Sequence, residues 1–351
     1  MNNSLTFSQR LIKLATLLFL VAPILLVSCK LLSLPSTVSI LLTQLDFPET
    51  QYYNALIKAN NDVIVLVDND RGDMQWYAKE GDKEFTKFTF AENTNCSSTK
   101  RYGSYETLPD GRLQVWKWCL TDKGGVDYLL AYDWETHQLE KIIGPLPLGS
   151  SGASWNPEQT QAIGYLDSKF ATKTLYWIYP DGFEPLDLVI QDDDRSWNLQ
   201  DDFPKFTADD TGKSGTTGRA SWSPDGETIA FFASPDAIGK TSFERFGVEF
   251  YLYLTNPETL QYEVVADRIF SPFLLSWSPD STRIAFIGRY GFWKTKGIWL
   301  YSTKDNSITE IAEGNFQGII WRSDQSVVAI KCESLDVCNQ VIEYDLTEII
   351  N

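Results

Sequence analysis

Few side chains of this protein are suited to acid–base or nucleophilic catalysis. The sequence holds 1 His, His137, which leaves little material for a histidine base or for a metal held by several imidazoles. Residues 212–214 read Gly-Lys-Ser, as at the end of a phosphate-binding loop, but Thr207 stands where that loop needs its first glycine. Residues 149–152 read Gly-Ser-Ser-Gly, which departs from the G-x-S-x-G pattern of serine hydrolases. We therefore expect no catalytic residues.

Acidic side chains gather in the segment 192–210, where their oxygens could bind Ca²⁺. They are Asp192, Asp193, Asp194, Asp201, Asp202, Asp209 and Asp210. Their spacing fits no EF-hand loop, so we interpret the segment as a solvated acidic loop. We expect no metal ligands and no cofactor, and a Ca²⁺ site is the alternative.

The cysteines indicate an oxidising compartment. Four of the 5 cysteines follow Cys29, and an even number in an exported chain predicts disulfides. We predict the pairs Cys96–Cys119 and Cys332–Cys338, because each pair flanks one local loop. Metal binding is the alternative, although neither pair has the C-x-x-C spacing.

The N-terminus has the features of an export signal. Arg10 and Lys13 precede an apolar run over residues 14–27, which is shorter than the roughly 20 residues of a membrane span. Residues 26–29 read Leu-Val-Ser-Cys, which resembles the lipobox of bacterial lipoproteins, where the cysteine becomes an acylated N-terminus. We predict a signal peptide over residues 1–28, lipidation of Cys29 and a tether over 29–49. An uncleaved anchor is the alternative. Either way, the body lies on the periplasmic or extracellular side, anchored to a membrane.

The net charge of −17, from 47 acidic and 30 basic residues, argues against one class of partner. An acidic body repels nucleic acid phosphates and anionic lipid heads. We therefore expect no nucleic-acid partner.

A strand–turn–strand phrase recurs along the rest of the chain. Its clearest copies read S-W-S-P-D-G-E-T-I-A-F at 221–231 and S-W-S-P-D-S-T-R-I-A-F at 276–286. Weaker copies lie at 59–66, 105–113, 154–164 and 320–329. The proline presets the first turn position and Asp-Gly accepts the left-handed geometry of a tight turn. The residues that we assign to this structural motif are Trp155, Pro157, Trp222, Pro224, Asp225, Trp277, Pro279, Asp280 and Trp321.

The copies recur about every 50 residues, which is the period of a four-stranded propeller blade. They resemble the WD-repeat-like units of the TolB-like family, which are six-bladed periplasmic β-propellers, over residues 50–351. The resemblance implies an all-β propeller of about six four-stranded blades. We expect no counterpart here to the α/β domain that precedes the propeller in the protein that gives the family its name, because only about 20 residues separate Cys29 from the first blade. The resemblance therefore speaks for the fold more than for that protein's role.

The last copy leaves its blade one strand short. After the hairpin at 320–329, residues 341–346 can form one more strand, and five residues remain. We expect a segment within 38–57 to supply the outer strand, which would join the two ends of the chain and remove an open sheet edge.

The loops of a propeller blade emerge alternately at its two ends. Here the turns within hairpins are short and the links between hairpins are long, and long loops on a rigid scaffold usually carry binding residues. We take the long-loop face as the binding face. Aromatic and arginine side chains, which are enriched in interfaces, make up the candidates: Phe243, Arg245, Phe246, Arg289, Tyr290, Phe292 and Trp293. The alternative is that the aromatic rings pack under their own loops.

These features predict a membrane-tethered, non-catalytic binding or scaffold protein of the cell envelope with a monomeric body. Its partner would be an envelope protein or another envelope component. One alternative is a propeller enzyme, a lyase or glycan hydrolase, with paired carboxylates about 5–10 Å apart at the central channel. Another is a periplasmic module that senses sugars or Ca²⁺.

Overall fold

In the computed structural model, the strands belong to one unit that extends from Leu41 to Ile350. The structure describes residues 41–44, 53–59, 63–70, 73–80, 86–88, 101–103, 107–121, 124–134, 136–146, 151–166, 174–186, 188–192, 195–198, 216–234, 236, 247–291, 294–334 and 337–350. Regular structure in these residues is almost entirely antiparallel β-strand, as predicted. They contain one helix, α2 (Thr347–Ile350). No helix in this part of the chain has the length and apolar character needed to cross a membrane.

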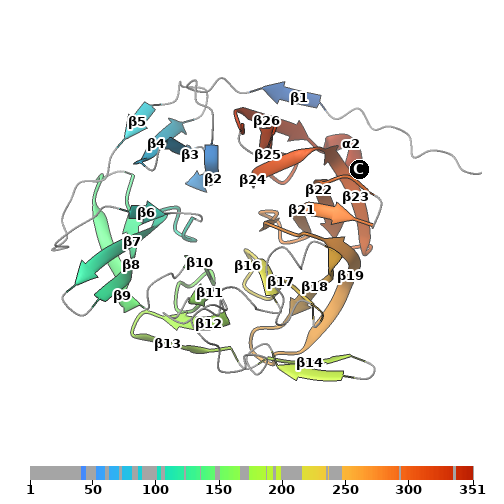
Figure 1. Cartoon of the computed structure of the whole chain (residues 1–351), viewed down its shortest axis with the longest axis horizontal. Coiled ribbons are helices and arrows are strands. Elements are labelled where there is room, and N and C mark those ends of the chain that lie inside the picture. The colour runs from blue at the N-terminus through green and yellow to red at the C-terminus, as the bar shows by residue number, and fades with distance from the viewer. Residues whose placement is uncertain are drawn as a thin grey trace, which may run out of the picture. The chain divides into compact units, whose positions relative to one another are not determined.

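Strands that follow one another in the chain pair into sheets, and we name each sheet by its first strand (Figure 1). The β2 sheet has the order β2 (Tyr53–Ala59), β3 (Val63–Asp70), β4 (Asp73–Glu80), β5 (Thr86–Phe88). The β6 sheet has the order β6 (Arg101–Gly103), β7 (Leu113–Thr121), β8 (Gly124–Tyr132), β9 (Leu139–Leu146). The β10 sheet has the order β10 (Ser151–Trp155), β11 (Ala162–Leu166), β12 (Thr174–Tyr179), β13 (Gly182–Pro185).

The second half of the unit continues the pattern. The β16 sheet has the order β16 (Thr216–Trp222), β17 (Ile229–Ala233), β18 (Glu249–Thr255), β19 (Tyr262–Phe270). The β20 sheet consists of β20 (Leu275–Trp277), β21 (Arg283–Tyr290), β22 (Gly297–Ser302), β23 (Ser307–Glu313). The end of β19 also pairs with β21, through Ile269 with Tyr290 and Phe270 with Arg289, and joins these two sheets. A separate hairpin consists of β14 (Val189–Asp192) and β15 (Arg195–Asn198).

The last sheet contains both ends of the unit. It has the order β24 (Asn315–Ser323), β25 (Ser326–Cys332), β26 (Gln340–Asp345), β1 (Leu41–Gln44). The segment β1 pairs antiparallel with β26, with Leu41 opposite Asp345 and Gln44 opposite Ile342. The prediction that a segment within 38–57 supplies the missing outer strand is confirmed.

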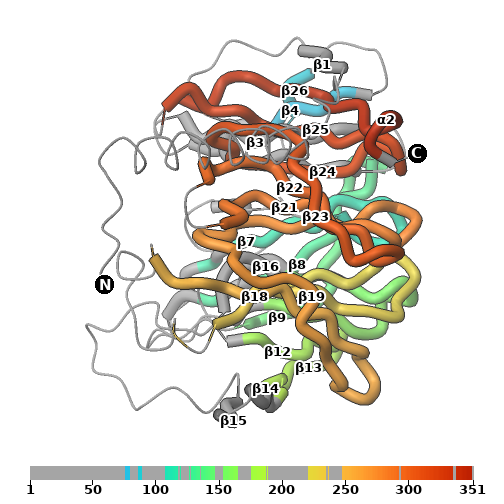
Figure 2. The backbone as a smooth tube through the Cα atoms, turned by 90° about the vertical axis from the view of Figure 1, so that its right-hand side faces the viewer, coloured from blue at the N-terminus to red at the C-terminus, as the bar shows by residue number. Residues whose placement is uncertain are grey.

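The pattern of burial explains why these residues form strands. The second strands carry continuous apolar runs, and every residue of β17 is buried. A strand covered on both faces reads as such a run rather than as an alternation. The outer strand β13, by contrast, is mostly exposed. The inner hairpins of the recurring phrase therefore lie between neighbouring sheets, and Figure 2 shows the β24, β20 and β16 sheets side by side.

The motif tryptophans are buried at the junctions between sheets. Trp155, Trp222, Trp277 and Trp321 are only 3% to 7% exposed. The indole of Trp277 donates to the backbone oxygen of Ser221 in the β16 sheet (3.1 Å), and that of Trp321 to the backbone oxygen of Ser276 in the β20 sheet (2.9 Å). The motif therefore links each of these sheets to the one before it.

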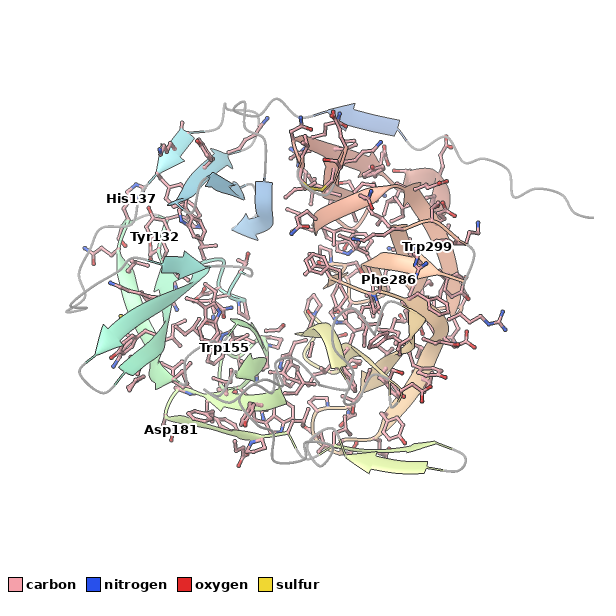
Figure 3. The ribbon with its side chains drawn as sticks, viewed as in Figure 1. Tyr132, His137, Trp155, Asp181, Phe286 and Trp299 are labelled. Atoms are coloured by element: carbon pink, nitrogen blue, oxygen red, sulfur yellow. A yellow bond between two sulfur atoms is a disulfide. The ribbon has the colours of Figure 1, made fainter. Side chains whose placement is uncertain are left out.

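The equivalent contact of Trp155 uses a side chain instead of the backbone. Its indole donates to Oε1 of Gln114 (2.9 Å), a fully buried glutamine on β7. Figure 3 shows Trp155 on the inner side of its sheet and Asp181 at the outer side. The indole N–H of Trp222 is buried and has no hydrogen-bond partner within the described part of the chain. Its backbone N–H instead binds Oγ of Ser154 (2.9 Å).

The cysteine predictions are borne out where they can be compared with the structure. Cys332 and Cys338 form a disulfide. Cys119 is disulfide-bonded, and its predicted partner Cys96 lies outside the described residues. Cys29 and the whole predicted signal peptide lie outside them too.

The indole contacts predict a difference between two equivalent substitutions. Trp277→Phe removes a hydrogen bond and leaves the Ser221 carbonyl without its donor, so we expect a loss of about 1–3 kcal/mol in the free energy of unfolding. Trp222→Phe removes no such bond and serves as the matched control, with a smaller loss from packing alone. Urea unfolding at neutral pH measures both. Equal losses in the two variants would contradict this role of the indole.

Candidate functional site

The two ends of the strands carry loops of different kinds. At one end lie the hairpin turns, such as the turn between β16 and β17, and we call it the short-turn end. At the other end, the long-loop end, lie the links between hairpins and between sheets, such as the link that runs from Ala233 at the end of β17 to Glu249 at the start of β18. The division follows from the antiparallel order of consecutive strands.

The short-turn end is occupied by hydrogen bonds between neighbouring sheets. The backbone N–H of Asp225 donates to Oγ of Ser281 (3.0 Å), and the backbone N–H of Asp280 donates to a carboxylate oxygen of Asp324 (2.9 Å). Each bond runs from the turn of one sheet to the turn of the next. The turns adopt the predicted left-handed geometry at Gly226 (φ 77°) and at Ser281 (φ 58°). This end of the unit is therefore structural.

The carboxylate of Asp280 holds its turn together. It accepts hydrogen bonds from the hydroxyls of Ser278 (2.6 Å) and Thr282 (2.8 Å) and from the backbone N–H of Thr282 (3.1 Å). Burial alone would raise the pKa of Asp280, but these hydrogen bonds and the charge of Arg283 outweigh it and hold the pKa below the usual 3.8. The residue is thus a structural anion.

At the long-loop end, the structure describes two of the predicted binding residues, Arg289 and Tyr290. The guanidinium of Arg289 lies 5.6 Å from the ring centroid of Phe270. The ring of Tyr290 lies 5.4 Å from that of Trp299 and packs against the core between the β16 and β20 sheets. That contact fits the alternative reading for Tyr290, a ring packed under its own loop. Both residues are half-buried.

The other predicted binding residues lie outside the described residues. They are Phe243, Arg245, Phe246, Phe292 and Trp293. Of the acidic cluster, Asp192 is described, at the end of β14, and the others are not. The residues that the structure describes include no group of three or more histidine, cysteine or acidic side chains placed to hold a metal ion.

Two residues at the long-loop end escaped the sequence analysis. Phe273, in the link from β19 to β20, is 39% exposed, and the ammonium of Lys296 lies 5.8 Å from its ring centroid. Burial lowers the pKa of Lys296. The two residues stand 23 positions apart. They come together because they precede β20 and β22, the two strands that pair with β21 on either side.

Comparison with known proteins places the fold. No protein-family model matches the sequence, and no curated protein matches it. The solved structure of TolB from Acinetobacter baumannii matches with a TM-score of 0.50 and 13% identity, over 84% of this chain and 63% of that one. The fold is a TolB-like β-propeller. This chain therefore spans less than two thirds of that TolB's length.

Two other solved propellers match over almost their whole length. The PQQ-bound aldose sugar dehydrogenase from Streptomyces coelicolor has a TM-score of 0.50 and 11% identity, over 88% of this chain and 98% of that one. An oligogalacturonate lyase from Vibrio parahaemolyticus has a TM-score of 0.49 and 12% identity, over 90% and 99%. At such identities the likeness concerns the propeller fold alone. A function has to come from the site, because one fold carries many activities.

The pKa of Asp280 predicts how stability responds to acid. A carboxylate with a lowered pKa in the folded state stabilises the protein above pH 3.8, and this contribution disappears as the pH falls through the folded-state value. We expect Asp280→Asn to be destabilised at pH 7, and the gap to the parent protein to narrow as the pH falls below 3.8. Urea unfolding at a series of pH values measures it. Asp181→Asn, in the exposed β12–β13 turn, is the control, and a gap that stays constant with pH would refute the assignment.

Proposed function

We propose that this protein is a non-catalytic binding or scaffold protein of the cell envelope, tethered to the membrane by a lipid on Cys29. The leader over residues 1–28 and the lipobox-like residues 26–29 support the tether. The disulfide between Cys332 and Cys338 fits an oxidising compartment outside the cytoplasm. Residues 29–49 would carry the tether and its connection to the propeller.

One observation carries the binding role, which is the contrast between the two ends of the propeller. The turns at the short-turn end are engaged with one another, as in the bond from Asp225 to Ser281. At the long-loop end, Phe273 is exposed and two cations, Arg289 and Lys296, lie over phenylalanine rings. Arginine and aromatic side chains are the types that dominate binding energy in protein interfaces.

We infer that the long-loop face engages an envelope protein or another envelope component. Phe243, Arg245, Phe246, Phe292 and Trp293 belong to the same proposed face, since they come from the β17–β18 and β21–β22 links. Rigid sheets with long loops at one end suit such a role. The proposal assigns no catalytic residue, no cofactor and a monomeric body.

The tether can be tested on the purified membrane form. We expect the mature N-terminal peptide to begin at Cys29 with the mass of attached acyl chains, and Cys29→Ser to lack that mass and to keep its leader. Mass spectrometry of both proteins measures this. Identical N-termini without acyl mass would favour the uncleaved anchor instead.

The binding face can be tested by capture from the native envelope after crosslinking. We expect the triple variant Arg245→Ala, Arg289→Ala and Trp293→Ala to retain its partner about 30-fold more weakly, which is about 2 kcal/mol for residues of this type. Arg112→Ala, at the short-turn end, is the control and should capture normally. Unchanged capture by the triple variant would exclude this face.

A further inference from the structure

Three cations converge where the β20 and β24 sheets meet at the long-loop end. Their directions follow from the alternation of side chains along a strand. Nη1 of Arg283 lies 3.5 Å from the backbone oxygen of Asp324, so this face of β21 looks toward the β24 sheet. Arg289, six residues further along β21, lies on the same face.

Lys296 joins Arg289 through the strand register. Gly288 pairs with Gly297 at the end of the β21–β22 ladder. Arg289 follows that pair on β21, and Lys296 comes immediately before β22. The two cations therefore lie at the same end of the ladder, where like charges repel each other.

Lys331 reaches the same place from the β24 sheet. Val327 pairs with Trp321, whose indole contacts Ser276 in the β20 sheet, so this face of β25 looks toward that sheet. Lys331 lies four residues after Val327 and shares its face.

Gly314 lies between the two lysines. Its N–H donates to the backbone oxygen of Lys296 (2.8 Å), and a Cβ built on it would lie 3.7 Å from Cε of Lys331. We call Arg289, Lys296 and Lys331 the junction cations.

The two lysines have no acidic partner in the part of the chain that the structure describes. Lys294, only two residues before Lys296, does pair with Glu310 (3.4 Å). Nearby Glu333 accepts the side-chain amide of Gln340 (3.2 Å). Both lysines are half-buried. Among the described residues they lack an acidic partner, even though acidic residues outnumber basic ones in this chain of net charge −17. An ammonium removed from water without a counter-charge is unfavourable, and a bound anion would relieve that cost.

We propose that the junction cations bind the carboxylates of an acidic peptide segment of a partner, with an apolar side chain of that segment packed on Phe273. This rests on the binding role proposed above. The position of Phe273 decides the ligand class, because its exposed ring beside the ammonium of Lys296 matches a ligand with an apolar group next to its charge. Inorganic phosphate has no such group. A lysine ammonium also acts as a compact point charge, so one carboxylate can pair with one lysine without a fixed two-point geometry.

A peptide titration tests the proposal directly. The probe is a fluorescein-labelled peptide of sequence Gly-Glu-Phe-Glu-Gly-Glu-Phe-Glu-Gly, followed by fluorescence anisotropy with the full chain. We expect Lys296→Gln with Lys331→Gln to weaken binding at least tenfold, and Lys296→Arg with Lys331→Arg to retain it. Lys141→Gln with Lys304→Gln, two exposed lysines away from the junction, is the matched control. Far-UV circular dichroism confirms that each variant is folded.

Several outcomes would overturn the assignment. Equal binding by the parent protein and by the Lys296→Gln, Lys331→Gln variant would place the peptide elsewhere. Displacement by pyrophosphate or by oligogalacturonate at lower concentration than by unlabelled peptide would assign the junction to phosphates or to acidic glycans.

Capture from the native envelope separates this proposal from the binding role itself. If the variant loses both the peptide and the native partner, the junction is the partner's site. If it loses the peptide but keeps the partner, the binding role stands and this site for it is wrong. If the parent protein captures nothing, the binding role fails, while the titration still decides what the junction binds.

Discussion

The contact between each sheet and the next is what the rest of the structure depends on. A four-stranded sheet that is apolar on both faces cannot remain exposed, so every inner hairpin needs a neighbour on each side. The motif tryptophans supply that contact and fix its register, because Trp277 and Trp321 end their apolar packing in a hydrogen bond to the neighbouring backbone. The bonds from Asp225 to Ser281 and from Asp280 to Asp324 add a second point of attachment in the turn that follows each of these tryptophans. Two points of attachment leave little freedom for one sheet to slide along another.

The two ends of the propeller differ in the side chains that they present. At the short-turn end, carboxylates such as that of Asp280 accept hydrogen bonds within their own turns. At the long-loop end, the described residues include two cations that lie over aromatic rings, Arg289 over Phe270 and Lys296 over Phe273. The net negative charge of the chain therefore does not mean that every part of its surface is acidic.

Most of the fold could be predicted because the residues of the recurring motif determine both a tight turn and a buried strand after it. Ser-Trp-Ser-Pro-Asp fixes a tight turn, and the apolar run after it fixes a strand covered on both faces, as in β17. The closing strand β1 followed from counting strands in the last sheet, and Cys332–Cys338 followed from local spacing. These features depend on residues close in sequence, or on a constraint that applies to the whole sheet.

The parts that sequence alone could not give depend on packing between sheets. The pairing of β19 with β21 joins strands that belong to different repeats, and no local pattern announces it. Lys296 and Lys331 look like ordinary exposed lysines until strand direction brings them to one junction. In the sequence, Gln114 is a polar residue within an apolar strand. The structure shows that its side chain accepts a hydrogen bond from the indole of Trp155.

The closing strand has a mechanical consequence. Any tension applied to the chain ahead of Leu41 is carried first by the four-pair ladder between β1 and β26, before it reaches a buried sheet. If that ladder peels away, the polar edge of β26 becomes free, and a free edge readily accepts a strand from another molecule. Pulling on the N-terminal side would thus turn a closed molecule into one that can recruit a new strand.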